Sequence, residues 1–326
     1  MYDSDYKLKA IGVSVVGKNK TVRTSIWRLR WNHRGLYFLI LVPVVYVFIF
    51  NYIPMYGVLM AFKNFSPRLG ILGSPWVGLY NFRRFFSSPN FLNILRNTLI
   101  LNIYGLIAGF PFPIIMAICV NHFIFRRFRK TVQSITFAPY FLSAVIMVGL
   151  IRQVLAIDTG AINQVIMALG GNQVNFMGVA GAFPHIYVWS GIWQGTGYSA
   201  IIYISSLAAV DPTLHEAAII DGATLLQRVW YVDLATIRPI IVIMLILSMG
   251  NMLATGFEKV YLLQTSLNLT ASEVITTYVY KVGLGAGGRA DYSFGTAIGL
   301  FQNAVGVILT LTVNRIANML TGESMF

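Results

Sequence analysis

The chain has 326 residues, of which 56% are hydrophobic and only 11% are charged. Soluble globular proteins usually carry about 25% charged residues, so this composition excludes a disordered chain, a nucleic-acid-binding tail protein and an ordinary soluble enzyme. The single cysteine, Cys119, excludes an intrachain disulfide and a cysteine-cluster metal site, while the formal net charge of +13 makes the position of the cations relative to a membrane informative.

Six apolar runs are long enough to cross a hydrocarbon layer of roughly 30 Å as helices. Helices are expected because a lone strand in lipid would leave its backbone groups without hydrogen-bond partners. In chain order the predicted spans cover residues 36–60, 98–120, 131–155, 183–210, 239–254 and 294–319. The sequence therefore predicts an all-α integral membrane protein with six transmembrane helices.

Basic residues indicate the orientation of these spans. The arm before the first span, the loops after the second and fourth, and the end of the sixth together hold 15 of the 24 Lys and Arg residues. Segments with the excess of Lys and Arg stay in the cytoplasm. Both termini are therefore expected on the cytoplasmic side, and the basic N-terminal arm is expected to contact anionic lipid headgroups.

Three short motifs resemble chemical sites but lack the context that those sites need. Residues 12–19 nearly match a phosphate-binding loop, but Asn19 replaces the Ser or Thr that would bind magnesium. The glycine pattern at 283–288 has no strand–turn–helix unit around it, which dinucleotide binding requires. His215 begins a zinc-protease-like pattern, but Ile219 stands where the second His would be. We therefore expect no catalytic residue, metal or cofactor in this chain, and no nucleic acid as its partner.

The segment 211–239 differs from the apolar runs on either side of it. Asp211-Pro212 is a helix start, because Asp caps free N–H groups and proline fits the first helical position. Asp221-Gly222 ends that helix, since glycine accepts the positive φ of a tight turn. A second short helix then leads into the fifth span. This helix–turn–helix either docks another protein or lies as an amphipathic loop on the membrane or on the chain's own spans.

In its residues this loop resembles the EAA loop of permease subunits of binding-protein-dependent ABC importers. The matching positions are Glu216-Ala217-Ala218, Asp221-Gly222-Ala223 and Pro239, in a loop two spans before the end of the chain. The chain departs from the family at Ala235, where proline is common. Three further segments are similar to the subfamily that handles oligosaccharides and polysaccharide fragments: Asn97-Thr98, Gln133 with residues 139–143, and residues 277–284.

The resemblance implies a subunit of an ATP-driven importer with the type I permease fold, in the bacterial cytoplasmic (inner) membrane. It also implies a second permease, expected to be a different chain, an ATPase dimer that holds ATP and Mg, and a periplasmic solute-binding protein. ATP hydrolysis then belongs to the ATPase, and this chain is a non-catalytic membrane subunit. Carried over residue by residue, the ATPase-coupling positions are Glu216, Ala217, Ala218, Asp221, Gly222 and Ala223.

Under this interpretation the chain divides into four parts. The first span is an anchor, because it is too long and begins too far from residue 1 for a cleaved signal peptide. The expected parts are a basic arm (1–35), the anchor helix with a periplasmic segment (36–97), a five-helix permease core (98–320) that contains the coupling loop 211–239, and a C-terminal tail (321–326).

Polar side chains inside a span point away from lipid, and aromatic, amide and hydroxyl groups suit sugar rings. The predicted oligosaccharide pathway consists of Arg152, Trp189, Trp193, Gln194, Tyr198, Asn251, Gln302 and Asn303. The alternative is that these groups form hydrogen bonds between helices or an interfacial aromatic belt. Arg152 and the basic excess of the outer segments favour an acidic oligosaccharide, although an acidic rim on the binding protein would explain the basic excess equally well. The family resemblance implies that an acidic substrate would be alginate-like.

The competing hypothesis is a secondary transporter driven by an ion gradient. Such proteins show paired internal repeats and acidic residues embedded in the membrane. The sequence has no clear repeat, and Asp158, Glu258 and Asp291 lie at or beyond the ends of the predicted spans. The sequence therefore favours the ATP-driven importer.

Overall fold

The computed structural model describes residues 34–321 apart from 124, 251, 254 and 286–289, and this part of the chain is helical without a β-strand. The predicted all-α class is therefore confirmed. The chain forms two compact units, residues 1–56 and 57–326. In the first unit, α2 (Arg34–Val47), the π-helix η1 (Phe48–Tyr52) and α3 (Ile53–Met55) follow one another as a single apolar run.

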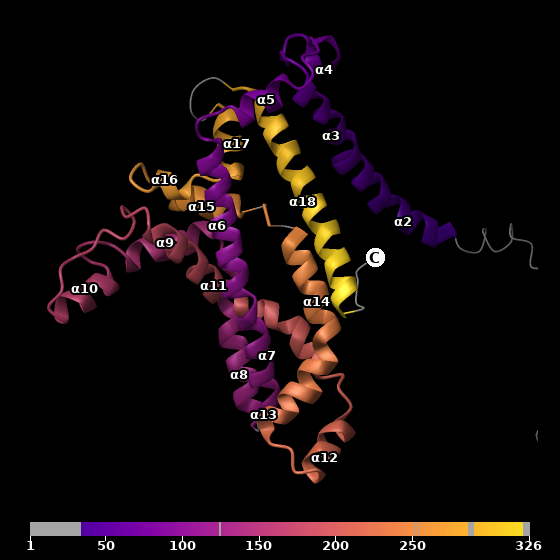
Figure 1. The fold of residues 1–326 in the computed structure, drawn as a ribbon, viewed down its shortest axis with the longest axis vertical. Coiled ribbons are helices and arrows are strands. Elements are labelled where there is room, and N and C mark those ends of the chain that lie inside the picture. The colour runs from indigo at the N-terminus through magenta and orange to yellow at the C-terminus, as the bar shows by residue number, and fades with distance from the viewer. Residues whose placement is uncertain (1–33, 124, 251, 254, 286–289, 322–326) are drawn as a thin grey trace, which may run out of the picture. The chain divides into compact units, whose positions relative to one another are not determined.

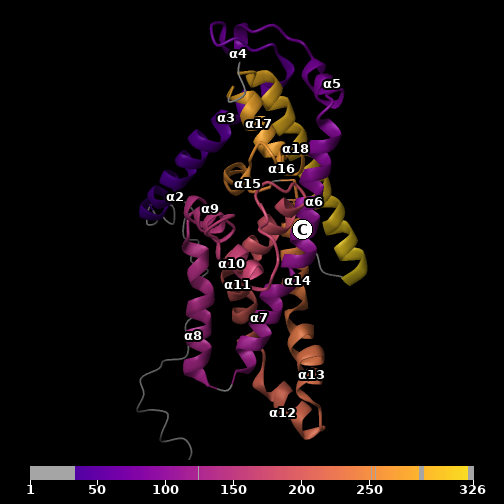
Figure 2. The same ribbon diagram turned by 90° about the vertical axis from the view of Figure 1, so that its left-hand side faces the viewer.

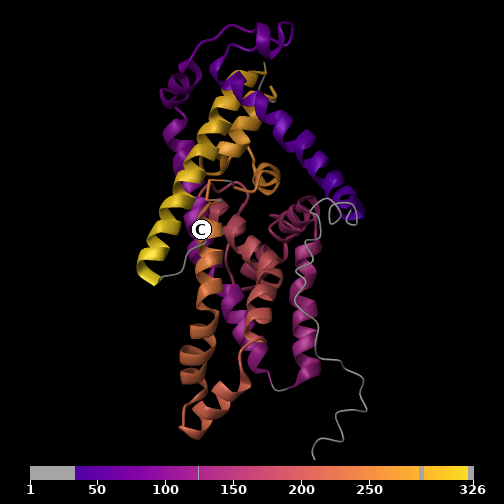
Figure 3. The same cartoon turned by 90° about the vertical axis from the view of Figure 1, so that its right-hand side faces the viewer.

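The helices of the second unit are shown in Figure 1. α12 and α13 lie at the end of this unit opposite α5 and α17 (Figures 1 and 2), and α18 packs against α14 and α17 (Figure 3). In chain order the elements are η2 (Tyr56–Phe62), α4 (Gly70–Gly73), α5 (Tyr80–Phe86), α6 (Phe91–Gly109), α7 (Pro111–His122), α8 (Arg126–Phe137), η3 (Ala138–Phe141), α9 (Ala144–Val154), α10 (Ala161–Ala168), α11 (Ala182–Leu207), α12 (Pro212–Ile220), α13 (Leu225–Arg228), η4 (Val229–Asp233), α14 (Leu234–Gly250), α15 (Phe257–Leu263), α16 (Leu269–Ser272), α17 (Ile275–Gly283) and α18 (Tyr292–Thr321).

Four helical segments in the described part of the chain are long and apolar enough to cross a membrane by themselves. They are Gly35–Phe62, Phe91–His122, Leu225–Gly250 and Tyr292–Met319, and each overlaps one of the six predicted spans. α11, which covers the predicted fourth span, has 26 residues and is long enough at about 1.5 Å per residue. Its Ser, Thr, Gln and Gly residues reduce its apolar character, because these residues interrupt an otherwise hydrophobic helix.

The predicted third span, residues 131–155, is bent. The segments Arg127–Phe141 and Ala144–Val154 meet at an angle of 100°, so they form either a broken span or a re-entrant loop. Pro139 opens the short 3-10 turn η3, and Ser143 then caps α9 by accepting a hydrogen bond from the N–H of Ile146. The apolar pattern continues through this break, which is why the sequence pattern alone predicted one straight helix.

The helix of the predicted fifth span begins earlier than residue 239. α14 begins at Leu234, directly after the π-helix η4, so Pro239 lies inside the helix. The ring of a proline crowds the carbonyl four residues earlier, here that of Ala235, and removes one backbone donor. Membrane helices tolerate such prolines, because neighbouring groups satisfy the freed backbone atoms.

Three clusters of buried apolar side chains hold the second unit together. The first joins α6, α9, α11 and α15, the second joins α7, α11 and α14, and the third joins α5, α6, α17 and α18. α11 belongs to two of the clusters and is the central helix of the unit. The largest side chains that are fully buried in these clusters include Leu101, Phe183, Ile237, Phe85 and Ile298.

Glycine allows α11 to cross α8 closely. A Cβ added at Gly197 would lie 2.1 Å from the carbonyl oxygen of Thr136 on α8, which is too close for any real side chain. Gly195, two residues earlier on the same helix, has open space within 4 Å of such a Cβ. The contact between the two helices therefore depends on one glycine rather than on small residues in general.

Gly197→Ala is expected to lower the stability of the protein, because backbone atoms of α8 must move to admit the methyl group. The expected loss is about 1–3 kcal/mol, the usual range for overpacking. The measurement is the thermal unfolding midpoint in detergent, with Gly195→Ala as the matched control. Equal midpoints for the two variants would contradict the close crossing of α8 and α11.

Candidate functional site

The helix α12 begins and ends with hydrogen bonds that its own sequence supplies. Asp211 caps the helix, since its carboxylate accepts a 2.9 Å hydrogen bond from the N–H of Thr213, and this bond lowers the pKa of Asp211. At the other end Gly222 has φ +78°. The N–H of Ala223 donates to the carbonyl of Ala218 (2.9 Å), and the N–H of Gly222 donates to the carbonyl of Ile219 (3.0 Å). This is a Schellman turn, so main-chain hydrogen bonds close it.

The second helix of the loop, α13, begins immediately after that turn. Thr224 and Gln227 form a capping box, in which the Thr224 N–H donates to Oε1 of Gln227 at 2.7 Å and the Gln227 N–H donates to the Thr224 hydroxyl at 3.4 Å. The Thr-x-x-Gln spacing signals this motif in the sequence, although the sequence analysis did not use it. The helix–turn–helix predicted for residues 211–239 is therefore present. Hydrogen bonds within the loop fix the start of each helix and the turn between them.

The six predicted coupling residues all lie on this loop, at one end of the second unit (Figure 1). Four of them are exposed, and Ala218 and Ala223, which close the turn, are half-buried. Two large apolar side chains stand beside them in solvent, Ile220 at 85% exposure and Leu226 at 79%. Exposed apolar side chains next to acidic ones are typical of a surface that another protein covers. The coupling role of the six residues stays a prediction.

A buried carboxylate ties the loop to the helices behind it. Asp233, at the end of η4, is fully buried, and its Oδ2 lies 2.7 Å from Nε2 of His122 at the end of α7. Its Oδ1 lies 3.2 Å from Nε2 of His215 on α12. The sequence analysis missed this cluster, because its three members lie up to 111 residues apart. In the described part of the chain, no group of three His, Cys, Asp or Glu side chains has the geometry to hold a metal ion.

Two adjoining cavities lie between α6, α7 and α11. One, of about 430 Å³, extends to α14, and the other, of about 340 Å³, extends to α15. They share Gly105, Gly109, Pro113, Tyr187 and Ser199. Of the predicted pathway residues, Gln194 lines the smaller cavity. Polar side chains that the prediction did not include also line them, namely Asn102, Ser248 and Lys259.

Similarity to known proteins extends over the whole chain. The polygalacturonan/rhamnogalacturonan transport system permease protein YteP of Bacillus subtilis is 39% identical over 326 residues, which is 100% of both chains. Protein LplB of the same organism is 40% identical over 314 residues, or 96% of each chain. This chain belongs to the permease subunits of sugar ABC transport systems. No family model matches the permease.

Solved structures support the same family. A chain from a bacterial ABC transporter involved in the import of the acidic polysaccharide alginate matches the permease with a TM-score of 0.83 at 33% identity, over 91% of this chain and 99% of that one. A second match, from the bacterial alginate transporter in complex with an alginate pentasaccharide-bound periplasmic protein, has the same TM-score at 32% identity, over 92% and 99%. The predicted role of a permease subunit in an ATP-driven sugar importer is thereby confirmed, and the ion-gradient transporter is set aside.

The three aromatic residues predicted to line the pathway of the permease are exposed on α11. Trp189 donates from Nε1 to the hydroxyl of Tyr104 at 2.8 Å. Tyr198 stacks on Tyr140, with ring centroids 3.8 Å apart and planes 4° from parallel. Trp193 is 55% exposed. Their contacts include aromatic and hydrogen-bond contacts between helices, which is the alternative role that the sequence left open.

The predicted arginine and two of the predicted amides bind backbone carbonyls of the permease. One of these amides is Gln194, whose Nε2 donates to the carbonyl of Leu142 at 3.0 Å. Arg152 donates to the carbonyl of Leu262 and so links α9 to α15. Gln302 donates to the carbonyl of Leu253 at 2.8 Å. Asn251 lies outside the described residues. These hydrogen bonds leave less of Arg152 and Gln302 available to a sugar, and their predicted role is untested.

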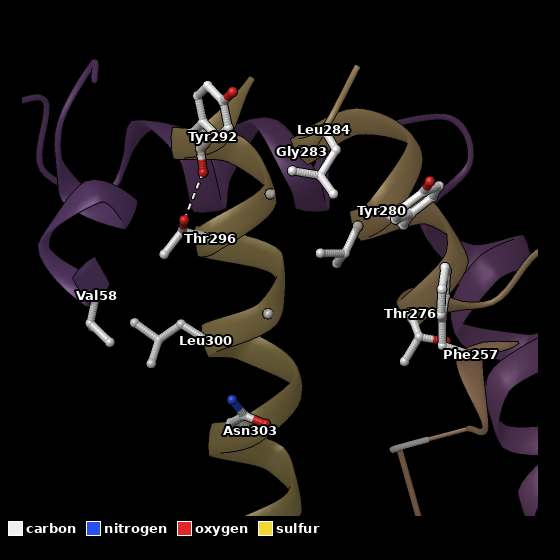
Figure 4. A pocket seen from close by; sticks show the side chains of 13 residues that line it. Val58, Phe257, Thr276, Tyr280, Gly283, Leu284, Tyr292, Thr296, Leu300 and Asn303 are labelled. Atoms are coloured by element: carbon white, nitrogen blue, oxygen red, sulfur yellow. Dashed lines mark hydrogen bonds between the residues drawn. The ribbon is translucent and has the colours of Figure 1, made fainter. Parts of the chain in front are cut away.

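Asn303 lies apart from the two cavities, at one end of a groove between α17 and α18 (Figure 4). The groove has a volume of about 510 Å³, and Val58, Leu300 and Phe257 are among its lining residues. Tyr292 and Thr296 stand at its other end, where the Thr296 hydroxyl donates to the Tyr292 carbonyl at 2.7 Å (Figure 4). Most of this lining is apolar, so the groove suits an apolar occupant better than an oligosaccharide.

Proposed function

We propose that this permease forms half of the membrane pathway of an importer for acidic oligosaccharides, driven by a separate ATPase through loop 211–239. The observation that carries the proposal is the exposed α12–turn–α13 segment in a chain of this family. The acidic substrate class is supported by two similar proteins, one named for polygalacturonan and rhamnogalacturonan and one an importer of alginate. Both kinds of polymer contain uronic acids.

The proposed topology has six transmembrane helices and both termini in the cytoplasm. Its support is the four apolar candidate spans, the bent pair α8–α9 and the 26-residue α11. Residues 1–33 of the basic arm lie outside the described residues, and its contact with lipid headgroups stays a prediction, as do the domain boundaries at residues 97 and 320. The proposed location is the bacterial cytoplasmic membrane.

In the proposed mechanism an ATPase dimer that holds ATP and Mg binds loop 211–239. Closure of the dimer moves the loop, and α14 follows because η4 joins it directly to the loop. The binding energy of the ATPase thereby shifts the equilibrium between two arrangements of the membrane helices. A different second permease completes the pathway, and a periplasmic binding protein delivers the oligosaccharide. Glu216 meets a basic group of the ATPase, and Gly222 holds the bend.

Affinity purification of the tagged permease from its native membrane tests this assembly. The expected companions are a second permease and an ATPase, together with a soluble sugar-binding protein when substrate is present. Recovery of the permease without any ATPase, under conditions that preserve a reference ABC importer, would contradict the proposed function.

Gly222→Val is expected to lower recovery of the ATPase several-fold while the second permease is retained. A β-branched side chain at φ +78° strains the turn, since left-handed backbone already costs about 1–2 kcal/mol for an ordinary residue. Gly170→Val is the matched control, because Gly170 has φ +82° and equally open space but lies after α10. The same ATPase recovery from both variants would show that the shape of the turn at 222 is not needed for docking.

A further inference from the structure

A lysine lies at the wall of the smaller cavity. Lys259 is on α15, outside the candidate spans, and it lines the cavity of about 340 Å³ together with Gln194, Thr196 and Ser199. Its Nζ donates a 3.2 Å hydrogen bond to the carbonyl oxygen of Tyr187 on α11 and lies 5.3 Å from the centre of the Tyr187 ring. The ammonium group is therefore held against α11, beside the cavity.

No carboxylate in the described part of the chain forms a salt bridge with this ammonium group. The salt bridges found there are Arg84–Asp291, Lys281–Glu273, His122–Asp233 and His215–Asp233. Burial lowers the pKa of Lys259 to about 8, because loss of water disfavours the charged form. The cavity therefore holds a partly desolvated cation without a described counter-ion.

The rest of the cavity lining suits a sugar ring. Gln194 brings an amide oxygen, since its Nε2 donates to the carbonyl of Leu142, and Ser199 brings a hydroxyl. Both groups match the hydroxyl groups of a sugar. Four glycines, at 105, 109, 191 and 195, leave stretches of the wall without side chains. A neutral sugar would use only these groups, whereas a uronate also carries a carboxylate that requires a cation or several N–H donors.

We propose that Lys259 binds a carboxylate of the oligosaccharide and thereby selects uronate-containing chains over neutral ones. The inference rests on the proposed function, because it requires this cavity to lie on the substrate pathway. An ammonium–carboxylate hydrogen bond is roughly twice as strong as one between neutral groups. A neutral sugar leaves the partly desolvated ammonium group with its hydrogen bond to the Tyr187 carbonyl but without a counter-ion. Both the attraction of the acid and the cost of the neutral competitor therefore contribute to specificity.

The test uses the complete importer, with its partner subunits and binding protein, in proteoliposomes. The probes are a short oligogalacturonate and its methyl-esterified form, and the readout is the ratio of their kcat/KM values for uptake. Lys259→Met is expected to reduce the preference for the acid by about tenfold, mainly through a higher KM, because it removes the charge and keeps the length. Lys259→Arg is expected to retain most of the preference. Lys130→Met removes an exposed cation of α8 that does not line the cavity and does not belong to the outer segments, and it is expected to leave the ratio unchanged.

A second variant reaches the same ammonium group from α11. A Cβ added at Gly191 would lie 3.5 Å from Nζ of Lys259, an ordinary contact distance. Gly191→Asp therefore supplies an internal carboxylate, and it is expected to abolish the preference for the acid even if Lys259→Met does not assemble. Gly191→Asn fills the same space without the charge and is expected to lower uptake of both probes alike.

The outcomes separate this inference from the proposed function. If the wild-type importer takes up neither probe, or both equally well, the acidic substrate class fails, and the role of Lys259 fails with it. If the wild-type importer prefers the acid and both Lys259→Met and Gly191→Asp keep that preference, the role of Lys259 alone is overturned. Loss of the preference in these variants, with retention in Lys259→Arg, supports the inference.

Discussion

Glu216→Lys is expected to abolish transport and the ATP hydrolysis that is coupled to it, while the permease still inserts into the membrane. Glu216 is exposed on α12, and it forms no salt bridge with another described residue. The fold of the chain therefore loses little when the charge is reversed. Opposed like charges at a protein interface cost several kcal/mol, so docking onto a basic ATPase surface would fail.

The measurement for Glu216→Lys is substrate-stimulated ATPase activity and uptake in proteoliposomes, with the amount of inserted permease determined in parallel. Asp158→Lys is the matched control, since Asp158 is also an exposed acid but follows α9 rather than lying on the loop. The control is expected to keep wild-type activity. Normal uptake by the Glu216→Lys importer would count decisively against a docking role for α12.

Asp233→Ala is expected to loosen the loop from the membrane helices and to uncouple ATP hydrolysis from transport. Asp233 is fully buried and accepts from His122 on α7 while it also contacts His215 on α12. Its removal leaves the Nε2 atoms of two partly buried imidazoles without this acceptor, and an unpaired buried polar group costs about 1–3 kcal/mol. Motion of α12 would then reach α14 only along the backbone of the loop, because the side-chain contacts of Asp233 with α12 and α7 are gone.

Two measurements on Asp233→Ala test this expectation: the thermal unfolding midpoint in detergent, and the number of ATP molecules hydrolysed per sugar imported. Arg84→Ala is the control, since the Arg84–Asp291 pair lies at the surface, and loss of such a pair costs at most about 1 kcal/mol. Asp233→Ala should lower the midpoint further and raise the ratio of ATP to sugar. A wild-type ratio in Asp233→Ala would show that the cluster stabilises the fold without transmitting motion.

Local signals predicted the loop well. The start of α12 is marked by Asp211, a capping acid that precedes a proline. Its end is marked by Gly222, which follows Asp221, and the structure has the helix between these two signals. Both signals act within a few residues, because they concern free N–H groups and backbone conformation. The apolar runs likewise predicted where helices lie, since burial in lipid needs only length and composition.

Contacts between distant segments could not be predicted in this way. The pairing of Asp233 with His122 and His215 requires three elements to meet, and no local pattern reports that. The position of Lys259 against α11 was not predicted either, because it depends on the packing of α15 against α9 and α11. The bend before α9 was missed for the opposite reason: Ser143 caps a helix within a run that stays apolar on both sides.

The turn after α12 is closed by main-chain atoms alone, and this separates the shape of the loop from the chemistry of its surface. The side chains of Glu216 and Ile220 project from a scaffold that does not need them, so both are open to exchange without unfolding. Substitutions at a few exposed positions of the loop should therefore be enough to direct the importer to a different ATPase. Where several permeases share one ATPase, we expect these exposed positions to vary less than the rest of the loop.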